Sequence, residues 1–74
     1  MAKHILVVED DVDIGRLLEI HLTDSEYAVD IVKTGNDGLQ FVRSKKYDLV
    51  ILDLMLPGVD GLVICRYIRS LPTF

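Results

Sequence analysis

The sequence has little cysteine and no long apolar run, and both shortages limit what the protein can be. Cys65 is its single cysteine, so an internal disulfide and a cysteine metal cluster are both impossible. The longest apolar runs, around residues 5–8 and 49–56, fall far short of the ~20 residues that cross a membrane. Acids follow the first run directly, which is not the pattern of a signal peptide. We therefore expect a cytoplasmic protein with no membrane partner.

Positive charge and phosphate-binding glycines are scarce too. Twelve acids against eight bases give a net charge of −4. The few bases are too scattered to form a nucleic-acid surface, so we expect no direct nucleic-acid binding. The turn after the first apolar run reads EDD, which matches neither GxGxxG nor GxxxxGK(S/T). A dinucleotide or P-loop nucleotide site is therefore not expected.

What the chain does have is a regular alternation of strand and helix patterns. Continuous apolar or β-branched runs predict strands at 5–8, 27–32 and 48–52. Asp30 interrupts the second of these runs, which suits an edge strand. Between and after the strands, three segments predict helices. The strands and helices then follow in the order β-α-β-α-β-α, which favours an open parallel sheet with helices on its faces.

The helix predictions rest on apolar spacing and on capping residues. The first helix should carry one apolar stripe and be capped by Asp11 or Asp13. Residues 33–36 have turn chemistry, and Gly38 weakens the start of the second helix. Asp60 can cap the third helix, on which Cys65 is expected to be a small buried residue. The expected apolar positions are Ile14, Leu17, Leu18, His21 and Leu22 in the first helix, Leu39, Phe41 and Val42 in the second, and Leu62, Ile64, Cys65 and Ile68 in the third.

Acidic residues follow two of the predicted strands. Glu9 and Asp10 come after the first strand and Asp53 after the third, and ligands of open α/β sheets bind at the carboxyl ends of strands. Two charges 4 Å apart repel by ~4 kcal/mol at an effective dielectric of 20. The cluster should therefore either hold protons or bind a hard cation. Oxygen ligands alone favour Mg²⁺, with Mn²⁺ as a possibility.

Two motifs in this frame resemble those of a known family. The stretches ILVVEDD at 5–11 and LVILDLMLPGVDG at 49–61 are similar to the receiver domain of two-component response regulators. The resemblance implies a flavodoxin-like (CheY-like) open sheet, truncated here to strand order 2-1-3. It also implies a signalling domain, not a classical enzyme, whose partner is a sensor histidine kinase. The family more often has alanine where this chain has Gly38.

The same resemblance assigns roles to particular residues. Asp53 would be the phosphoacceptor in a Mg²⁺-dependent reaction. Glu9 and Asp10 would be the acidic pair that serves the metal, and Asp10, Asp53 and the backbone carbonyl of Met55 would be its ligands. Residues 1–74 would form the N-terminal portion of one receiver domain. The Ser/Thr and Lys that hold the phosphoryl oxygens in the family lie beyond this chain, so we expect it to phosphorylate poorly.

Two other interpretations remain to be compared with this one. With strand order 2-1-3 the third strand is an apolar edge, and such edges recruit partners. The chain would then act as a self-associating unit, a homodimer or larger assembly. A haloacid-dehalogenase-like phosphatase would also use a strand-end aspartate with Mg²⁺. That class needs a second aspartate two residues after the first, where this chain has Met55.

Overall fold

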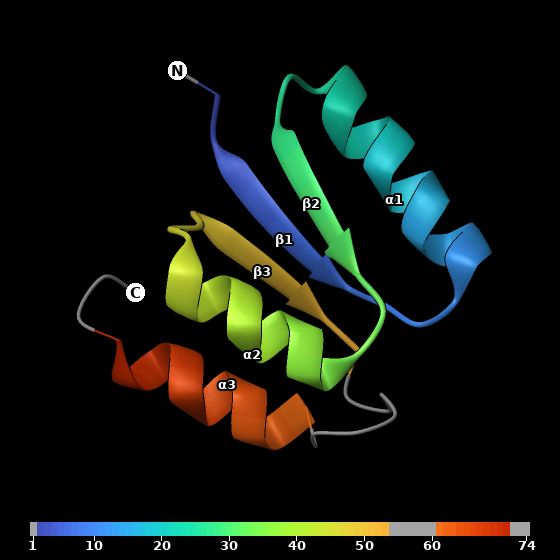
Figure 1. The fold of residues 1–74 in the computed structure, drawn as a ribbon. Coiled ribbons are helices and arrows are strands. Elements are labelled where there is room, and N and C mark those ends of the chain that lie inside the picture. The colour runs from blue at the N-terminus through green and yellow to red at the C-terminus, as the bar shows by residue number, and fades with distance from the viewer. Residues whose placement is uncertain (1, 54–60, 72–74) are drawn as a thin grey trace.

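The fold is a three-stranded parallel sheet with helices on both faces. The computed structural model describes residues 2–53 and 61–71. In these residues the chain alternates between strands and helices (Figure 1): β1 (His4–Val8), α1 (Val12–Asp24), β2 (Ala28–Val32), α2 (Gly35–Ser44), β3 (Leu49–Leu52) and α3 (Gly61–Ser70). The strand order is β2-β1-β3. The predicted element order and sheet order are both confirmed.

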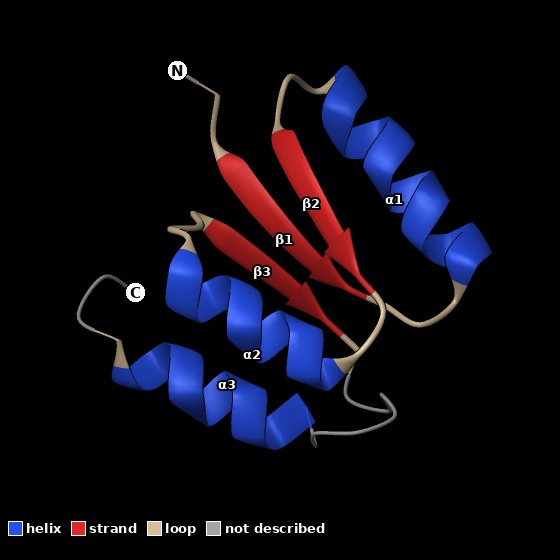
Figure 2. Cartoon of the chain, in the orientation of Figure 1, coloured by secondary structure: helices blue, strands red, loops and turns tan. Residues whose placement is uncertain are grey.

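β1 occupies the centre of the sheet and pairs in parallel with both neighbours (Figure 2). Successive side chains of a strand point to opposite faces. Leu6 and Val8 therefore share one face, where they pack with residues of α2 and α3. Ile31 points to the other face, close to Gly15 of α1. The sheet thus separates α1 on one side from α2 and α3 on the other.

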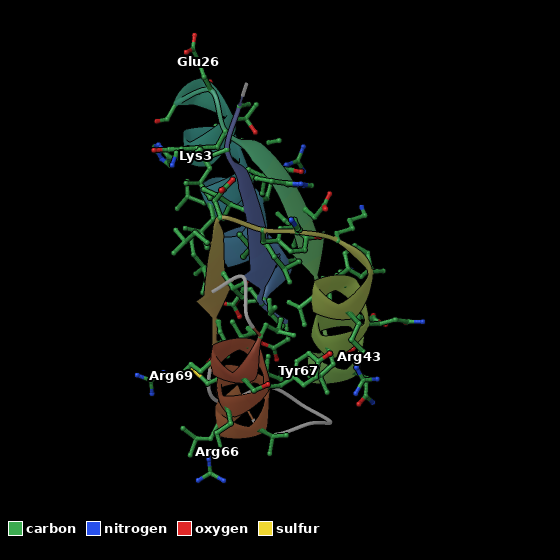
Figure 3. The ribbon with its side chains drawn as sticks, turned by 90° about the vertical axis from the view of Figure 1, so that its left-hand side faces the viewer. Lys3, Glu26, Arg43, Arg66, Tyr67 and Arg69 are labelled. Atoms are coloured by element: carbon green, nitrogen blue, oxygen red, sulfur yellow. The ribbon has the colours of Figure 1, made fainter. Side chains whose placement is uncertain are left out.

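The face under α2 and α3 holds the closed part of the core. Leu6 and Ile64 are fully buried, and Val8 is 1% exposed. Burying a side chain of this size contributes about 1.5–3 kcal/mol. The Arg43 guanidinium of α2 also lies 5.2 Å from the centre of the Tyr67 ring of α3 (Figure 3), so the two helices contact each other as well as the sheet.

The single apolar stripe predicted for α1 is wrong. Gly15 is buried, and Leu18 and Leu22 are half-buried, whereas Ile14 is 47% and Leu17 57% exposed. The predicted His21 position is exposed as well. The reason is tertiary: α1 contacts β2 and β1, so one narrow face of the helix reaches the sheet. Apolar spacing alone does not separate that face from its neighbour.

The helix ends agree with the capping predictions in part. Asp11 is the cap of α1, and its Oδ1 accepts from the backbone N–H of Asp13 at 2.9 Å and of Ile14 at 3.1 Å. The predicted turn at 33–36 is shorter than expected, because Thr34 caps α2 through Asp37 N–H at 3.1 Å and the helix begins at Gly35.

Two further expectations concern α3. Ile64 and Ile68 are buried as expected, but Leu62 is exposed. Cys65 is exposed too, so its expected burial is wrong: α3 turns it away from the core that Ile64 and Ile68 enter. The proposed cap Asp60 lies outside the described residues. Within the described chain, each helix is too short or too polar to span a bilayer.

Candidate metal and phosphoacceptor site

The carboxyl ends of β1 and β3 bring the predicted acids together. In the sheet register Val8 is paired with Leu52, so the residues that follow, Glu9 and Asp53, leave the sheet side by side. Two backbone hydrogen bonds extend the pairing by one residue: Asp53 N–H donates to Val8 O at 3.2 Å, and Glu9 N–H donates to Val32 O at 3.0 Å. The backbone at this edge is therefore held from both sides of β1.

Three carboxylates converge at this edge. Glu9, Asp10 and Asp53 each offer one oxygen, and these atoms all lie within 4.8 Å of one another. Glu9 and Asp53 are half-buried and Asp10 is exposed. The structure thus brings together the three side chains that the sequence predicted for one site, while Met55 lies outside the described residues.

Glu9 shows the electrostatic consequence of this crowding. A hydrogen bond from Asp11 N–H, 3.3 Å from Glu9 Oε2, lowers the Glu9 pKa. Desolvation, the Asp10 carboxyl and the Asp53 charge act against it, and together they raise the pKa of Glu9 above its ordinary value. The proton is therefore held more tightly here than in water, because a second negative charge is unfavourable beside the first.

Asp11 has a different role, although it follows the acidic pair directly. Its carboxylate caps α1 through two backbone N–H groups. A carboxylate at a helix N-terminus is stabilised by those donors and by the helix dipole. Capping therefore accounts for Asp11, as the sequence predicted.

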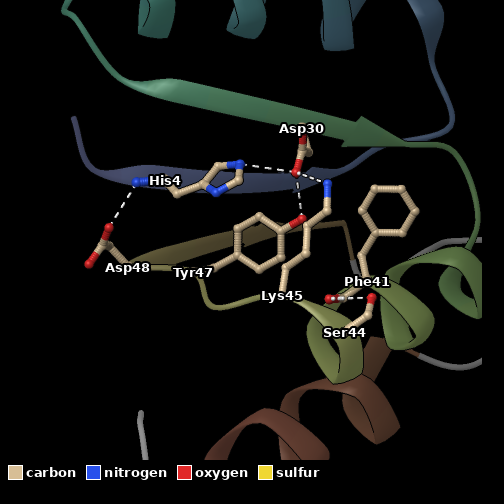
Figure 4. Close-up of polar contacts among 7 residues, drawn as sticks. All are labelled: His4, Asp30, Phe41, Ser44, Lys45, Tyr47 and Asp48. Atoms are coloured by element: carbon tan, nitrogen blue, oxygen red, sulfur yellow. Dashed lines mark hydrogen bonds and ion pairs between the residues drawn. The ribbon is translucent and has the colours of Figure 1, made fainter. Parts of the chain in front are cut away.

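A second polar cluster, which we call the Asp30 group, was not predicted; in it Tyr47, Lys45 and His4 surround the Asp30 carboxylate. Figure 4 shows three side chains converging on Asp30 Oδ2: Tyr47 OH donates at 2.6 Å, Lys45 Nζ at 3.2 Å, and His4 Nε2 lies 3.0 Å away. Asp48 completes this end of the sheet by accepting from His4 N–H at 2.8 Å. The sequence carries no local signal for this group, because its members come from β1, β2 and the segment between α2 and β3.

The donors determine how Asp30 and Tyr47 ionise. Desolvation raises the Asp30 pKa, but hydrogen bonds from Tyr47 and Lys45 and the nearby charges outweigh it, so the pKa lies below its ordinary value. The pKa of Tyr47 is raised by desolvation and by the Asp30 carboxylate. Tyr47 therefore remains a neutral donor and Asp30 an anion.

Comparison with known proteins identifies the fold and its family. The sequence model of the response regulator receiver domain matches residues 5–73. The chain belongs to this family. Response regulator ArlR of Staphylococcus epidermidis is 51% identical over 70 residues, which are 95% of this chain and 32% of ArlR. ArlR of Staphylococcus aureus is 54% identical over 66 residues, 89% of this chain and 30% of that protein.

Solved receiver structures agree with the architecture. The receiver domain of a sensor histidine kinase from Pseudomonas aeruginosa, solved with a magnesium ion coordinated in its active-site cleft, superimposes with a TM-score of 0.90 at 29% identity, over 99% of this chain and 60% of that one. TrrA from Thermotoga maritima, in complex with Mg²⁺-BeF, gives 0.87 at 41% identity, over 92% and 59%. The CheY-like fold class is confirmed, and the chain spans about a third of the curated ArlR relatives.

Proposed function

We propose that residues 1–74 are the N-terminal portion of a cytoplasmic receiver domain in which Asp53 accepts a phosphoryl group from a sensor histidine kinase, in a Mg²⁺-dependent reaction. The observation that supports this most is the convergence of Glu9, Asp10 and Asp53, each offering an oxygen within 4.8 Å of the others. Membership of the receiver family gives that cluster its proposed role.

The residues present fit a magnesium ion. All three donors are carboxylate oxygens, which Mg²⁺ and Mn²⁺ prefer. The three oxygens all lie within 4.8 Å of one another, which is the scale of ligand separations around one ion with bonds of ~2.0–2.1 Å. Asp10, Asp53 and the Met55 carbonyl would bind the ion, with Glu9 beside them. When bound, the ion would neutralise charge on the phosphoryl oxygens.

The chain's own part in the transfer is to position Asp53. Its backbone N–H is tied to Val8 O, and its side chain is half-buried, so the carboxylate is partly desolvated yet reachable. One Asp53 oxygen attacks the phosphorus of the donor, and the bond from phosphorus to the leaving group breaks. The leaving group keeps the electron pair, and Asp53 becomes an acyl phosphate.

We expect the transfer to be slow in this chain alone. The resemblance places a Ser/Thr and a Lys that bind phosphoryl oxygens beyond its last residue. Losing one fixed donor to a developing charge costs about 10²–10³ in rate. The acidic cluster would then retain metal binding while phosphorylation is impaired.

The experiment is intact-mass measurement after incubation with acetyl phosphate and Mg²⁺. The transfer yields acetate and a chain heavier by one phosphoryl group, and Asp53→Asn should show no adduct. Asp24→Asn, an exposed acid at the end of α1, is the matched control and should behave as wild type. An adduct that persists in Asp53→Asn would refute Asp53 as the acceptor, and no adduct in a folded wild-type chain after long incubation would mean that residues 1–74 keep the receiver architecture without its chemistry.

A second candidate function is self-association through β3. Within the described residues β3 pairs on one side alone, and Leu49 is 49% exposed. A groove of about 260 Å³ runs between this edge and α3; its lining residues are Asp48, Leu49, Val50, Leu52, Cys65, Ile68 and Arg69. An unguarded apolar edge favours pairing with a second copy.

Sedimentation at micromolar concentrations tests this candidate. The wild-type chain should form dimers, and Leu49→Lys, which adds a charge to the edge, should be monomeric. Lys33→Glu, a charge change at an exposed site outside the groove, is the control and should still form dimers. A folded wild-type monomer over the whole range would exclude self-association.

A further inference from the structure

A reciprocal pair of hydrogen bonds joins the start of β3 to the start of β1, at the end of the sheet opposite the acidic cluster. His4 N–H donates to Asp48 Oδ2 at 2.8 Å (Figure 4), and Asp48 N–H donates to His4 O, also at 2.8 Å. Asp48 thus accepts from and donates to the same residue of β1. Sliding one strand along the other would break both bonds together, so the pair favours one alignment of the two strands.

The apolar sequence of the two strands does not by itself choose that alignment. β3 reads Leu-Val-Ile-Leu, and β1 has Ile-Leu-Val-Val after His4. A strand with one apolar and one polar face is fixed in register by the face that must be buried, whereas a strand with two similar faces slips more easily. β3 is of the second kind, and within the described residues it pairs with β1 alone. A specific polar contact at its end can supply the register that the pattern leaves open.

The register matters because the two strands carry the acids at their far ends. Val8 pairs with Leu52. Glu9 and Asp53 therefore leave the sheet side by side, and the carboxylate oxygens of the cluster lie within 4.8 Å of one another. One register step moves a strand by ~3.3 Å along its neighbour, a distance comparable with the cluster itself. Mg²⁺ needs its ligands at ~2.0–2.1 Å in near-octahedral geometry, so a slipped β3 would take Asp53 out of the site.

We propose that Asp48 is a positioning residue for the acidic cluster: it sets the register of β3 against β1 and so holds Asp53 beside Glu9. Asp48 precedes β3 and Asp53 follows it, so the effect passes through the backbone of the strand. The inference rests on the proposed function of the cluster as a Mg²⁺ site.

Three variants isolate the contact. Asp48→Ala removes the acceptor of His4 N–H, and Asp48→Asn keeps a side-chain oxygen in its place. Tyr47→Phe is the matched control: it removes the 2.6 Å hydrogen bond from Tyr47 OH to Asp30 and weakens the same end of the sheet, but it leaves the contact between β1 and β3 intact. Thermal unfolding shows which variants fold. If Asp48→Ala does not, Asp48→Ser, with a shorter side chain, takes its place and should show the same changes in smaller measure.

The first readout is amide hydrogen exchange without metal. Asp53 N–H bonds β3 to β1, and Glu9 N–H bonds β1 to β2, so the Glu9 amide reports the side of β1 that Asp48 does not contact. In Asp48→Ala the Asp53 amide should exchange about tenfold faster relative to the Glu9 amide, the effect of losing about one hydrogen bond. The ratio should keep its wild-type value in Asp48→Asn and in Tyr47→Phe.

The second readout is Mg²⁺ affinity, from a titration followed by backbone amide resonances. Asp48→Ala should bind Mg²⁺ about tenfold more weakly than wild type, the scale found when contacts that orient metal ligands are lost. Asp48→Asn and Tyr47→Phe should bind it as wild type does.

The outcomes separate this inference from the proposed function. If Asp48→Ala folds and keeps both the exchange ratio and the Mg²⁺ affinity of wild type, the inference is wrong and the proposed function stands. If the Asp53 and Glu9 amides lose protection to the same extent, Asp48 supports stability in general instead of register, and the inference is again wrong. A folded wild-type chain with no Mg²⁺-dependent shifts would refute the metal site, and the exchange ratio would still decide whether Asp48 sets the register.

Discussion

Two acids of the same sheet lie in opposite surroundings. Desolvation raises the pKa of Asp30 in β2. Hydrogen bonds from Tyr47 and Lys45 and the charges of Lys45 and His4 outweigh it, and they hold the pKa below the ordinary 3.8. Glu9, after β1, receives a hydrogen bond from Asp11 N–H that lowers its pKa. Desolvation and two neighbouring carboxyl groups outweigh that bond and raise the pKa above the ordinary 4.5.

Burial does not distinguish the two acids, because both are half-buried. The difference lies in their partners. Asp30 is surrounded by donors from this chain, so its charge is compensated within the fold. The Glu9 cluster gathers like charges, which protons or a bound cation would compensate. The Asp30 group therefore supports the fold, whereas the repulsion within the Glu9 cluster costs stability, which fits the metal-binding role proposed for it.

Removing Asp30 should have the largest effect on stability. Asp30→Ala leaves Tyr47 OH and Lys45 Nζ without their acceptor, and Tyr47 is 6% exposed. We expect the free energy of unfolding to fall by about 2–3 kcal/mol, since a buried donor without a partner costs about 1–3 kcal/mol. Urea unfolding measures this, with Asp24→Ala as the exposed control. A loss equal to that of the control would show that the Asp30 group contributes nothing.

Replacing Asp53 should change the free energy of unfolding in the opposite direction from replacing Asp30. Without metal, Asp53→Asn removes one charge from the crowded cluster and should raise the free energy of unfolding by about 0.5–1 kcal/mol. At a Mg²⁺ concentration ten times the dissociation constant, the wild-type chain should gain about 1.4 kcal/mol and Asp53→Asn much less. The measurement is thermal unfolding with and without Mg²⁺. Destabilisation of the metal-free variant would mean that the Asp53 carboxylate supports the fold as Asp30 does.

The pH dependence should separate the two acids more finely. A lowered folded pKa makes the Asp30 contribution present above pH 3.8 and lost as the pH falls through the folded value. A raised folded pKa makes the Glu9 contribution present below pH 4.5 and lost as the pH rises through the folded value. Urea unfolding from about pH 3 to pH 7 measures both effects. As the pH falls below 3.8, Asp30→Asn should lose less unfolding free energy than wild type. As the pH rises above 4.5, Glu9→Gln should lose less unfolding free energy than wild type. Parallel curves for both variants would contradict this.

The sequence predicted the parts of the molecule that depend on local pattern. Apolar runs that end in acids predicted β1 and β3. Because parallel strands end at one edge of a sheet, the sequence alone also predicted that Glu9, Asp10 and Asp53 lie together. The cap of α1 was narrowed to Asp11 or Asp13, because the capping rule involves residues two and three positions away, and the structure shows that it is Asp11.

The features that the sequence did not predict depend on tertiary packing, that is, on which helix covers which face of the sheet. Leu17 and Leu18 are equivalent in apolar spacing, yet the sheet lies under one of them alone. Cys65 has the spacing of a core residue, but the orientation of α3 leaves it exposed. Asp30 could be recognised as an edge acid, but its donors lie 15 and 17 residues away, across a helix, and no short-range rule connects them. The burial of Gly38 against Val8 is likewise a property of packing.

Lys45 should contribute least to the Asp30 group. Its side chain is 49% exposed, its Nζ lies 3.2 Å from Asp30 Oδ2, and it also lies over the Phe41 ring at 5.1 Å. Lys45→Met keeps the aliphatic stem and removes the charge, so we expect a loss of about 0.5 kcal/mol that shrinks as salt is added. Urea unfolding at low and high ionic strength measures both values. A salt-independent loss above about 1 kcal/mol would contradict this, and would show that the ammonium group matches the Tyr47 hydroxyl as a hydrogen-bond partner of Asp30.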